Sequence, residues 1–295
     1  MKTSSSLDLE LRKDVTGFYD LFSKVPFCAY SAVPSLAGLA GGNPLLDPIV
    51  GKFFVALACK RLSKAISGRG KPKSIQMAGL GLGMTFIISF ESAKLAVRVK
   101  NELRERQVHH FWEEQPAFLV ENAATRFKRE ADTLTILSKK RLSPKPLDWD
   151  DEHICVEFVE GQSIFHLAKS GSLSKKHLEL AFSAMDRMHS SGIIYADSNP
   201  ANILVTKKNE IQLLDFEKAY NPNYIKSKDM PRVDLAMFIE RFNQYAQSEF
   251  KEHIKLFSSA LRSETECSFS DLIETMRKYP VIFRRGTDNL LEEIA

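Results

Sequence analysis

Three polar side chains in one short stretch have the types and spacing for phosphate or proton chemistry. Asp197 and Asn202 are five residues apart in YADSNPANILV, and Asp215 follows the apolar run EIQLL. The apolar runs predict two strands of a hairpin, whose pairing would bring Asn202 and Asp215 to the same end of a small sheet. Two oxygen ligands side by side suit Mg²⁺ when phosphates and water fill its other positions. Asp197 is then left to accept a hydroxyl proton or to orient a nucleophile.

The segments around these residues predict a strand-rich part followed by a helical part. Residues 74–100 combine a glycine cluster, a β-branched and aromatic run, a polar turn and an alternating run, which is typical of a strand hairpin. Residues 103–140 carry apolar side chains at helical spacing, and SPKP ends them. Residues 153–161 predict a buried strand, residues 174–192 an amphipathic helix, and the C-terminal fifth of the chain further helices. This order favours an α+β chain over alternating βαβ units.

The combined pattern D-x-x-x-x-N and hydrophobic-D-F resembles the catalytic and metal-binding loops of the protein-kinase-like superfamily. The resemblance covers residues 76–241 and presents glycines, a strand cation, a helix Glu, a hinge and the two loops in the superfamily's order. It implies an α+β, bilobal protein-kinase-like fold with a strand-rich N-lobe and a mainly helical C-lobe. The expected parts are an apolar and basic N-terminal helical extension at 1–73, the N-lobe at 74–160 and the C-lobe at 161–295.

The resemblance assigns roles to the residues of the two loops. It implies that Asp197 is the catalytic base and that Asn202 and Asp215 are the Mg²⁺ ligands. Asp234, in RVDLA, is expected to brace the catalytic loop through backbone hydrogen bonds. The implied loop over the ATP phosphates consists of Gly79, Gly81 and Gly83. Taken alone, this glycine cluster is also what a tight turn between strands uses.

The resemblance also predicts a phosphate-binding cation on the strand LAVRVK. Aligning LAVR with the V-A-I-K motif puts Arg98 in the lysine position, whereas a two-residue slip puts Lys100 there. Both side chains lie on the same strand face because side chains alternate, and Lys100 is the first choice. The implied partner is Glu130, although a Glu on a charged helix is by default solvated. The segment VEFVEG resembles the hinge that holds adenine, with Glu157 and Val159 as binding residues.

Several departures from the superfamily's pattern bear on the kind of kinase. Tyr195 stands in the position of the catalytic-loop His, and Asn199 stands where a lysine is expected two residues after the base. Glu217 replaces the glycine of DFG. The stretch EKAYNPNYIKSKDMPR then leads directly to the predicted helix VDLAMFIERF. Such a short stretch leaves little room for the long activation segment that docks a peptide.

The segments YADSNPANIL, DFEK and RVDLAMF are similar to those of lipopolysaccharide-core kinases, including the Kdo kinase type. That family phosphorylates sugars of a membrane-anchored glycolipid at the cytoplasmic face. The resemblance implies an ATP-dependent phosphotransferase, with ATP and Mg²⁺ as cofactors, that moves the γ-phosphate to a sugar hydroxyl of the lipopolysaccharide core. The expected partners are therefore ATP and a glycolipid or sugar acceptor, and no nucleic acid is expected.

Three other functions stay open. Protein kinases or ATPases of the RIO or Bud32 type also have short activation segments, and RFKREADTLTIL is similar to the Bud32 helix. A small-molecule kinase similar to the aminoglycoside phosphotransferases is the second alternative. The third belongs to another class, a non-catalytic pseudokinase scaffold. The joint presence of Asp197, Asn202 and Asp215 favours an enzyme over the scaffold, because a pure binding module needs none of them.

The basic excess of the chain lies in its N-terminal quarter. The net charge is +4, and residues 1–75 hold 11 Lys or Arg against 5 Asp or Glu. In residues 25–59 the apolar sequence is interrupted by GGNP and Asp47 before it becomes long enough to span a membrane. A cationic run at 60–73 follows. Residues 25–73 are expected either to pack on the lobes as helix and linker, or to contact an anionic membrane surface.

The N-terminus and the cysteines indicate the compartment. Residues 1–20 are polar and lack the apolar core of a secretory signal peptide. The four cysteines are far apart and include no CxxC pair, so neither a zinc site nor a disulfide framework is suggested. A cytoplasmic location is therefore expected, with peripheral contact at the inner face of the cytoplasmic membrane as a further option.

Overall fold

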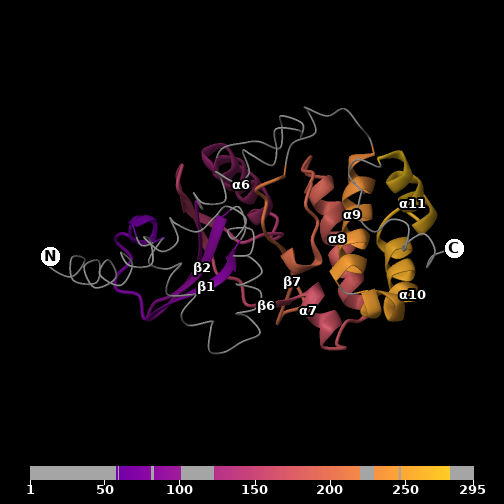
Figure 1. The fold of residues 1–295 in the computed structure, drawn as a ribbon, viewed down its shortest axis with the longest axis horizontal. Coiled ribbons are helices and arrows are strands. Elements are labelled where there is room, and N and C mark those ends of the chain that lie inside the picture. The colour runs from indigo at the N-terminus through magenta and orange to yellow at the C-terminus, as the bar shows by residue number, and fades with distance from the viewer. Residues whose placement is uncertain are drawn as a thin grey trace, which may run out of the picture. The chain divides into compact units, whose positions relative to one another are not determined.

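The protein is described by a computed structural model, and the chain divides into two compact units. The described residues are 58, 60–80, 83–100, 123–219, 229–245 and 247–279. The first unit comprises Met1–Phe127 and Leu147–Phe158, and the second comprises Lys128–Pro146 and Val159–Ala295. Figure 1 shows the larger sheet in the N-terminal part of the chain and most helices in the C-terminal part. The predicted α+β fold, strand-rich first and mainly helical afterwards, is confirmed.

The first unit is built on a five-stranded sheet in the order β1-β2-β3-β5-β4. Its strands are β1 (Ser74–Leu80), β2 (Gly83–Ser89), β3 (Lys94–Lys100), β4 (Pro146–Trp149) and β5 (His153–Glu157). Antiparallel pairing joins β1 to β2, β2 to β3 and β3 to β5. The predicted hairpin is therefore β2 with β3, and the glycine-rich residues before it contribute the additional strand β1. The β-branched and aromatic residues of β2 and β3 suit a half-buried pleated surface.

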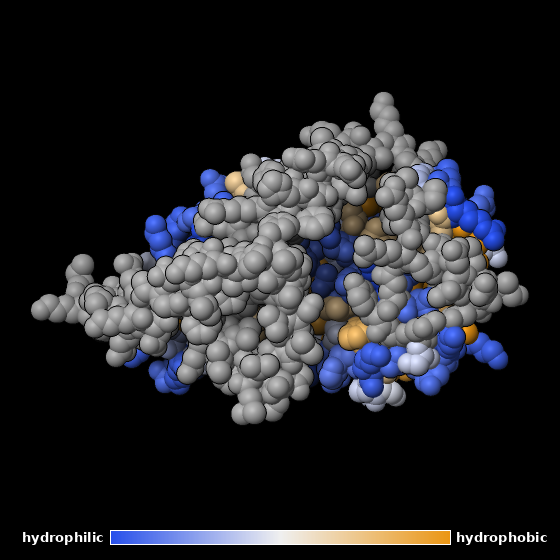
Figure 2. All heavy atoms as spheres, in the orientation of Figure 1, coloured by the Kyte–Doolittle hydropathy of each residue, from blue (hydrophilic) through white to orange (hydrophobic). Residues whose placement is uncertain are grey.

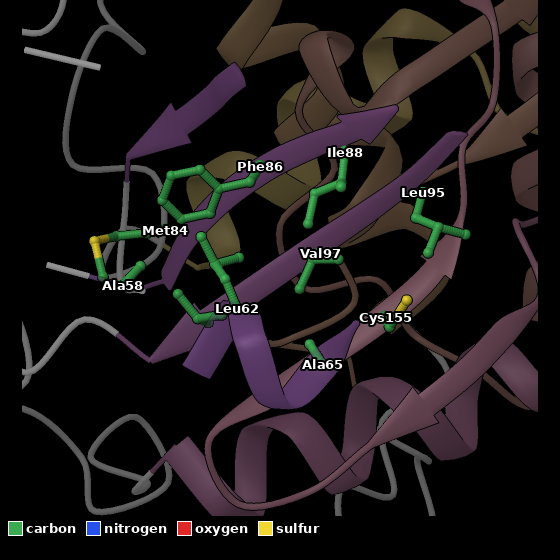
Figure 3. Close-up of a cluster of buried hydrophobic side chains, with 10 residues drawn as sticks. Ala58, Leu62, Ala65, Met84, Phe86, Ile88, Leu95, Val97 and Cys155 are labelled. Atoms are coloured by element: carbon green, nitrogen blue, oxygen red, sulfur yellow. The ribbon is translucent and has the colours of Figure 1, made fainter. Parts of the chain in front are cut away.

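One face of this sheet packs against the helical residues 60–65 and Ala58 (Figure 3). Side chains on β2 and β3 alternate between buried and partly exposed positions, as the period of a strand requires. The buried set contains Met84, Phe86, Ile88, Leu95, Val97 and Val99. Leu62 is 2% exposed, and burying such a side chain contributes about 1.5–3 kcal/mol. The last part of the predicted N-terminal extension therefore belongs to the core of this unit.

The basic residues near this helix are partly paired with carboxylates of the same unit. Lys64 forms an ion pair with Asp150, and the Lys73 ammonium lies 3.3 Å from a Glu91 carboxylate oxygen. These contacts fit the prediction that the segment packs on its lobe. The rest of the apolar stretch, residues 25–57 and Cys59, lies outside the described residues. Among the helices that the structure describes, none has the length and apolar character needed to cross a membrane.

The second unit combines a small sheet with helices. Its antiparallel sheet has the order β6-β7-β8, with β6 (Gly161–Ser163), β7 (Ile203–Thr206) and β8 (Ile211–Leu213). The described helices are α6 (Ala123–Ser138), which begins in the first unit, α7 (Ile164–Lys169), α8 (Lys175–His189), the 3₁₀ turn η2 (Pro200–Asn202), α9 (Met230–Tyr245), α10 (Gln247–Glu264) and α11 (Phe269–Lys278). The predicted helix at 174–192 is α8. The Ser174 side chain caps its start, and Gly192 follows its end in the left-handed region that glycine tolerates.

A cluster of phenylalanines forms the core between α8, α9 and α10. The Phe182 and Phe238 ring centroids are 5.6 Å apart, and those of Phe242 and Phe257 are 4.7 Å apart, both in edge-to-face geometry. Aromatic pairs of this geometry add to the stabilisation that burial alone provides. The described surface on the face drawn in Figure 2 is mostly hydrophilic, with scattered apolar residues. The phenylalanine cluster thus joins α8, which precedes the loop of Asp197, to α9 and α10.

Candidate active site

Pairing of β7 with β8 brings Asn202 and Asp215 to one end of the small sheet. Ile203 lies opposite Leu213, and the backbone N–H of Leu214 donates a 2.9 Å hydrogen bond to the carbonyl oxygen of Asn202. Asn202 directly precedes β7, and Asp215 lies two residues after the end of β8. The predicted hairpin is confirmed. A carboxylate and an amide oxygen at one sheet end form a donor set that fits Mg²⁺ together with phosphate oxygens.

The backbone adopts the left-handed region at two non-glycine residues of these loops. The φ angle is 59° at Ala196 and 64° at Asp215. Residues other than glycine adopt this region at a cost of about 1–2 kcal/mol, so the surrounding contacts must hold them there. Ala196 directly precedes Asp197, and Asp215 is itself a predicted metal ligand. The strained positions therefore coincide with the predicted catalytic and metal-binding loops.

Asp234, a fully buried residue of α9, holds the backbone at Ala196. Its two carboxylate oxygens accept hydrogen bonds from the backbone N–H groups of Tyr195, at 2.6 Å, and Ala196, at 2.8 Å. The Ser198 hydroxyl donates to the Asp234 backbone carbonyl at 2.5 Å, and His189 Nε2 lies 2.9 Å from Asp234 Oδ2. These bonds confirm that Asp234 braces the backbone before Asp197, as predicted, while the contact from His189 was not predicted.

Tyr195 fills the interior between the two loops. Its ring is fully buried and stacks on Phe216 with a centroid distance of 4.9 Å. Its hydroxyl donates to the backbone carbonyl of Leu214. Burial raises the pKa of this hydroxyl well above its usual value, and the negative charges of Asp215 and Asp197 raise it further. Tyr195 is therefore a neutral packing residue that joins the loop before Asp197 to the loop before Asp215.

Asp197 forms an ion pair with Lys218, the last residue of DFEK. The Lys218 ammonium lies 2.5 Å from Asp197 Oδ2. Burial lowers the pKa of Lys218, but the charge and hydrogen bond of Asp197, with the carboxylates of Glu217 and Asp215, outweigh it and leave that pKa raised. The lysine thus carries its positive charge at neutral pH. The DFEK motif contains this lysine, but nothing in the motif indicates its contact with Asp197.

Helix α6 makes an unpredicted contact with the loop that contains DFEK. The Arg129 guanidinium donates two hydrogen bonds to the backbone carbonyl of Glu217, at 2.6 and 3.2 Å. The next residue, Glu130, is only 4% exposed, so the default expectation that it is solvated is wrong. Its predicted pairing with Lys100 stays a prediction. The contact of Arg129 links this helix to the loop after Asp215.

Arg98 and Lys100 lie on one face of β3, opposite the face that forms the core. Leu95, Val97 and Val99 are buried, whereas the residues between them are partly exposed, so the predicted common face is confirmed. A Cβ atom added to Gly83 would lie 2.7 Å from the Arg98 Cγ and Cδ atoms. The stem of Arg98 therefore packs directly over Gly83.

The other predicted nucleotide-binding residues lie on described strands and loops, with one exception. Gly79 is in β1, next to an irregularity in its pairing with β2, and Gly81 lies outside the described residues. Glu157 ends β5 and is exposed, and Val159 is partly buried in the connection that follows. The chain passes from the first unit to the second between Phe158 and Val159. Binding of ATP by these residues stays a prediction.

Comparison with known proteins finds similarity to a RIO domain and to several protein kinases. A model of the RIO domain matches residues 84–255, which is more than half of the chain. A probable serine/threonine-protein kinase of Clostridium perfringens is 28% identical over 48% of this chain and 20% of its own length. A probable serine/threonine-protein kinase of Streptomyces coelicolor is 27% identical over 31% of this chain and 15% of its own length. The serine/threonine-protein kinase LATS1 of Homo sapiens is 23% identical over 73% of this chain and 20% of its own length.

The chain thus spans a fifth or less of the length of these relatives. The RIO match and the kinase relatives support the prediction of a kinase. They favour the RIO alternative over the lipopolysaccharide-core kinases, to which they show no particular closeness. The match also includes the loops with Asp197, Asn202 and Asp215, and it ends within α10. The chain belongs to the RIO domain family of the protein-kinase-like superfamily.

Proposed function

We propose that this protein is an ATP-dependent phosphotransferase of the RIO type. The observation that carries the proposal is the placement of Asn202 and Asp215 at one end of paired strands, with Asp197 in a braced loop before them. Such a set supplies oxygen ligands for a divalent cation and a carboxylate for the acceptor hydroxyl. The match to the RIO domain and the kinase relatives support the same activity.

In the proposed reaction, the acceptor oxygen forms a bond to the γ-phosphorus of ATP as the bond from that phosphorus to the bridging oxygen of ADP breaks. The hydroxyl proton passes to the Asp197 carboxylate. Asn202 and Asp215 would hold Mg²⁺, which when bound neutralises phosphate charge. Catalysis would come mainly from positioning, because phosphoryl transfer asks for little covalent chemistry from the protein.

The proposed nucleotide contacts are the residues that the resemblance to the superfamily predicts. Lys100, with Arg98 as the second choice, would bind the α- and β-phosphates, and Glu130 would orient that cation. Adenine would bind to the backbone near Glu157 and Val159. The proposed loop over the phosphates consists of Gly79, Gly81 and Gly83.

The acceptor that we propose first is a protein hydroxyl, or water in an ATPase reaction, since the family match is to a RIO domain. A sugar hydroxyl of a membrane glycolipid is the second candidate, supported by the similarity of YADSNPANIL, DFEK and RVDLAMF to lipopolysaccharide-core kinases. It would involve contact of residues 25–73 with an anionic membrane. The ion pairs of Lys64 and Lys73 reduce the positive charge available for such contact.

A γ-³²P transfer assay with Mg²⁺ tests the function and separates the acceptors. Wild-type protein and Asp197→Ala would each receive a protein mixture, crude membrane glycolipid, or neither. Label in protein, or release of phosphate without an acceptor, that requires Asp197 would support the RIO-type reaction. Label in the glycolipid that requires Asp197 would instead favour the sugar kinase. No transfer and no thermal shift with ATP and Mg²⁺ would contradict the proposal and leave a non-catalytic scaffold.

A further inference from the structure

The ion pair between Lys218 and Asp197 joins the loop after Asp215 to the loop that carries Asp197. Lys218 comes three residues after Asp215, and its ammonium lies 2.5 Å from one oxygen of Asp197, Oδ2. The side chains of Lys218 and Asp197 are 34% and 20% exposed, so water screens the pair only in part. Most exposed ion pairs contribute little, but a partly buried pair at one fixed oxygen can determine how a carboxylate is oriented.

The backbone on both sides of Lys218 is held in place. Arg129 binds the carbonyl of Glu217, the residue before it, through two hydrogen bonds. The backbone N–H of Ala219, the residue after it, donates to the Phe216 carbonyl at 3.0 Å, and Phe216 stacks on Tyr195. These contacts fix the base from which the lysine side chain extends. The ammonium therefore reaches Asp197 from a preorganised loop.

The position two residues after Asp197 does not supply a cation to this carboxylate. It is Asn199, whose side-chain oxygen accepts a 2.9 Å hydrogen bond from the backbone N–H of Ala201 and so caps η2. Its backbone N–H donates to the Asp197 carbonyl at 2.7 Å. Asn199 thus shapes the backbone of the loop, and Lys218 from the facing loop provides the positive charge at the Asp197 side chain.

We propose that Lys218 is a positioning residue for Asp197. The Lys218 ammonium binds Oδ2 of Asp197 and thereby directs Oδ1 toward the acceptor hydroxyl. The proposal rests on the proposed phosphotransferase function. One carboxylate oxygen is then committed to the lysine, and the other keeps one orientation for the hydroxyl proton. A misplacement of a reacting group by about 1 Å can cost about a hundredfold in rate, so loss of this contact should slow the transfer step.

The test compares kcat and KM for ATP among wild type, Lys218→Met, Lys218→Arg and Lys207→Met in the transfer assay. Met keeps most of the apolar stem without the charge, and Arg keeps the charge. Lys207 is a matched control, since it forms an ion pair with Glu160 at 3.0 Å but is 79% exposed. We expect Lys218→Met to lower kcat on the order of 10–100-fold with KM for ATP within about twofold, because the contact orients the reacting carboxylate. Lys218→Arg should recover much of the loss, and Lys207→Met should behave as wild type.

The other outcomes contradict distinct parts of the proposal. If Lys218→Met transfers phosphate as wild type does, the positioning role is wrong while the phosphotransferase function stands. Loss of ATP binding or of folding in both Lys218 variants, measured by thermal shift with and without ATP and Mg²⁺, would show a structural role and overturn the proposal. Absence of transfer by the wild type overturns the proposed function, and the role of Lys218 with it.

Discussion

The carboxylate of Asp234 accepts a 2.8 Å hydrogen bond from the backbone N–H of Ala196, whose φ angle is 59°. The residue that follows Ala196 is Asp197. A buried carboxylate on α9 thus holds a strained peptide next to the predicted catalytic base. The brace acts through the backbone and leaves the Asp197 side chain available to Lys218 and, as proposed, to the acceptor.

Removal of this carboxylate should destabilise the protein strongly. In Asp234→Ala, the N–H groups of Tyr195 and Ala196 and the ring of His189 lose their shared acceptor in a buried place. We expect a loss of about 2–5 kcal/mol in the free energy of unfolding by urea. The exposed Asp186 of α8 is the control, and its change to Ala should cost at most about 0.5 kcal/mol. Similar losses for the two variants would contradict the bracing role.

Relief of the backbone strain at Ala196 should stabilise the protein. Glycine adopts φ near 59° without the steric cost, which is about 1–2 kcal/mol, but it loses about 0.5–1 kcal/mol more backbone entropy on folding. Ala196→Gly should therefore raise the free energy of unfolding by about 0.5–1 kcal/mol. The same change at Ala201, which is not among the described positive-φ residues, should lower it. A loss at both positions in urea unfolding would show that Ala196 carries no strain.

Glu240 should make stability depend on pH. Burial raises the pKa of this side chain to about 7, from its usual value of 4.5, against the opposing charge of Arg241. Between these two values the unfolded chain loses the proton while the folded chain keeps it, so stability falls as the pH rises from about 4.5 to 7. The loss is on the order of 3 kcal/mol at most. The free energy of unfolding by urea, measured at about pH 5 and about pH 8, should fall in the wild type and fall less in Glu240→Gln. Equal falls in the two proteins would exclude Glu240 as the source of the pH dependence.

Substitutions on β3 should separate the two candidate phosphate-binding cations. The Arg98 stem packs over Gly83, whereas Lys100 occupies the end of the strand. We expect Lys100→Met to raise KM for ATP by about tenfold or more, because one charge contact to phosphate is worth at least about 1.4 kcal/mol. Arg98→Met should change KM by less than about threefold. The reverse order of the two effects would assign the phosphate contact to Arg98.

The local patterns predicted the elements that position the site. Apolar runs beside Asn202 and Asp215 specify a hairpin because strand pairing depends on nearby residues, and β7 and β8 have that arrangement. The resemblance also predicted the bracing by Asp234, since that residue lies in a motif with a recurring place in the superfamily's fold. These features depend on short sequence patterns, so they could be inferred from the amino-acid sequence alone.

The contacts that the sequence did not predict depend on tertiary packing. Lys218 is 21 residues from Asp197, and Arg129 is 88 residues from Glu217. Lysine and arginine side chains reach in many directions, so neither spacing nor residue type indicates their partners. Glu130 is buried for a similar reason, because the exposure of a charged helix residue depends on what packs against that helix. The acceptor preference for lipopolysaccharide rested on short loop similarities, whereas the RIO match covers more than half of the chain.

The proposed role of Asp197 as the catalytic base is tested by the change Asp197→Asn, measured by single-turnover transfer of γ-³²P and by the thermal shift with ATP and Mg²⁺. Asn is nearly isosteric with Asp but cannot accept the hydroxyl proton as a carboxylate does. We expect transfer to fall by about 10²–10⁴-fold while the thermal shift is kept, because general-base catalysis contributes that much. Transfer at the wild-type rate by this variant would contradict the assignment of Asp197 as the catalytic base.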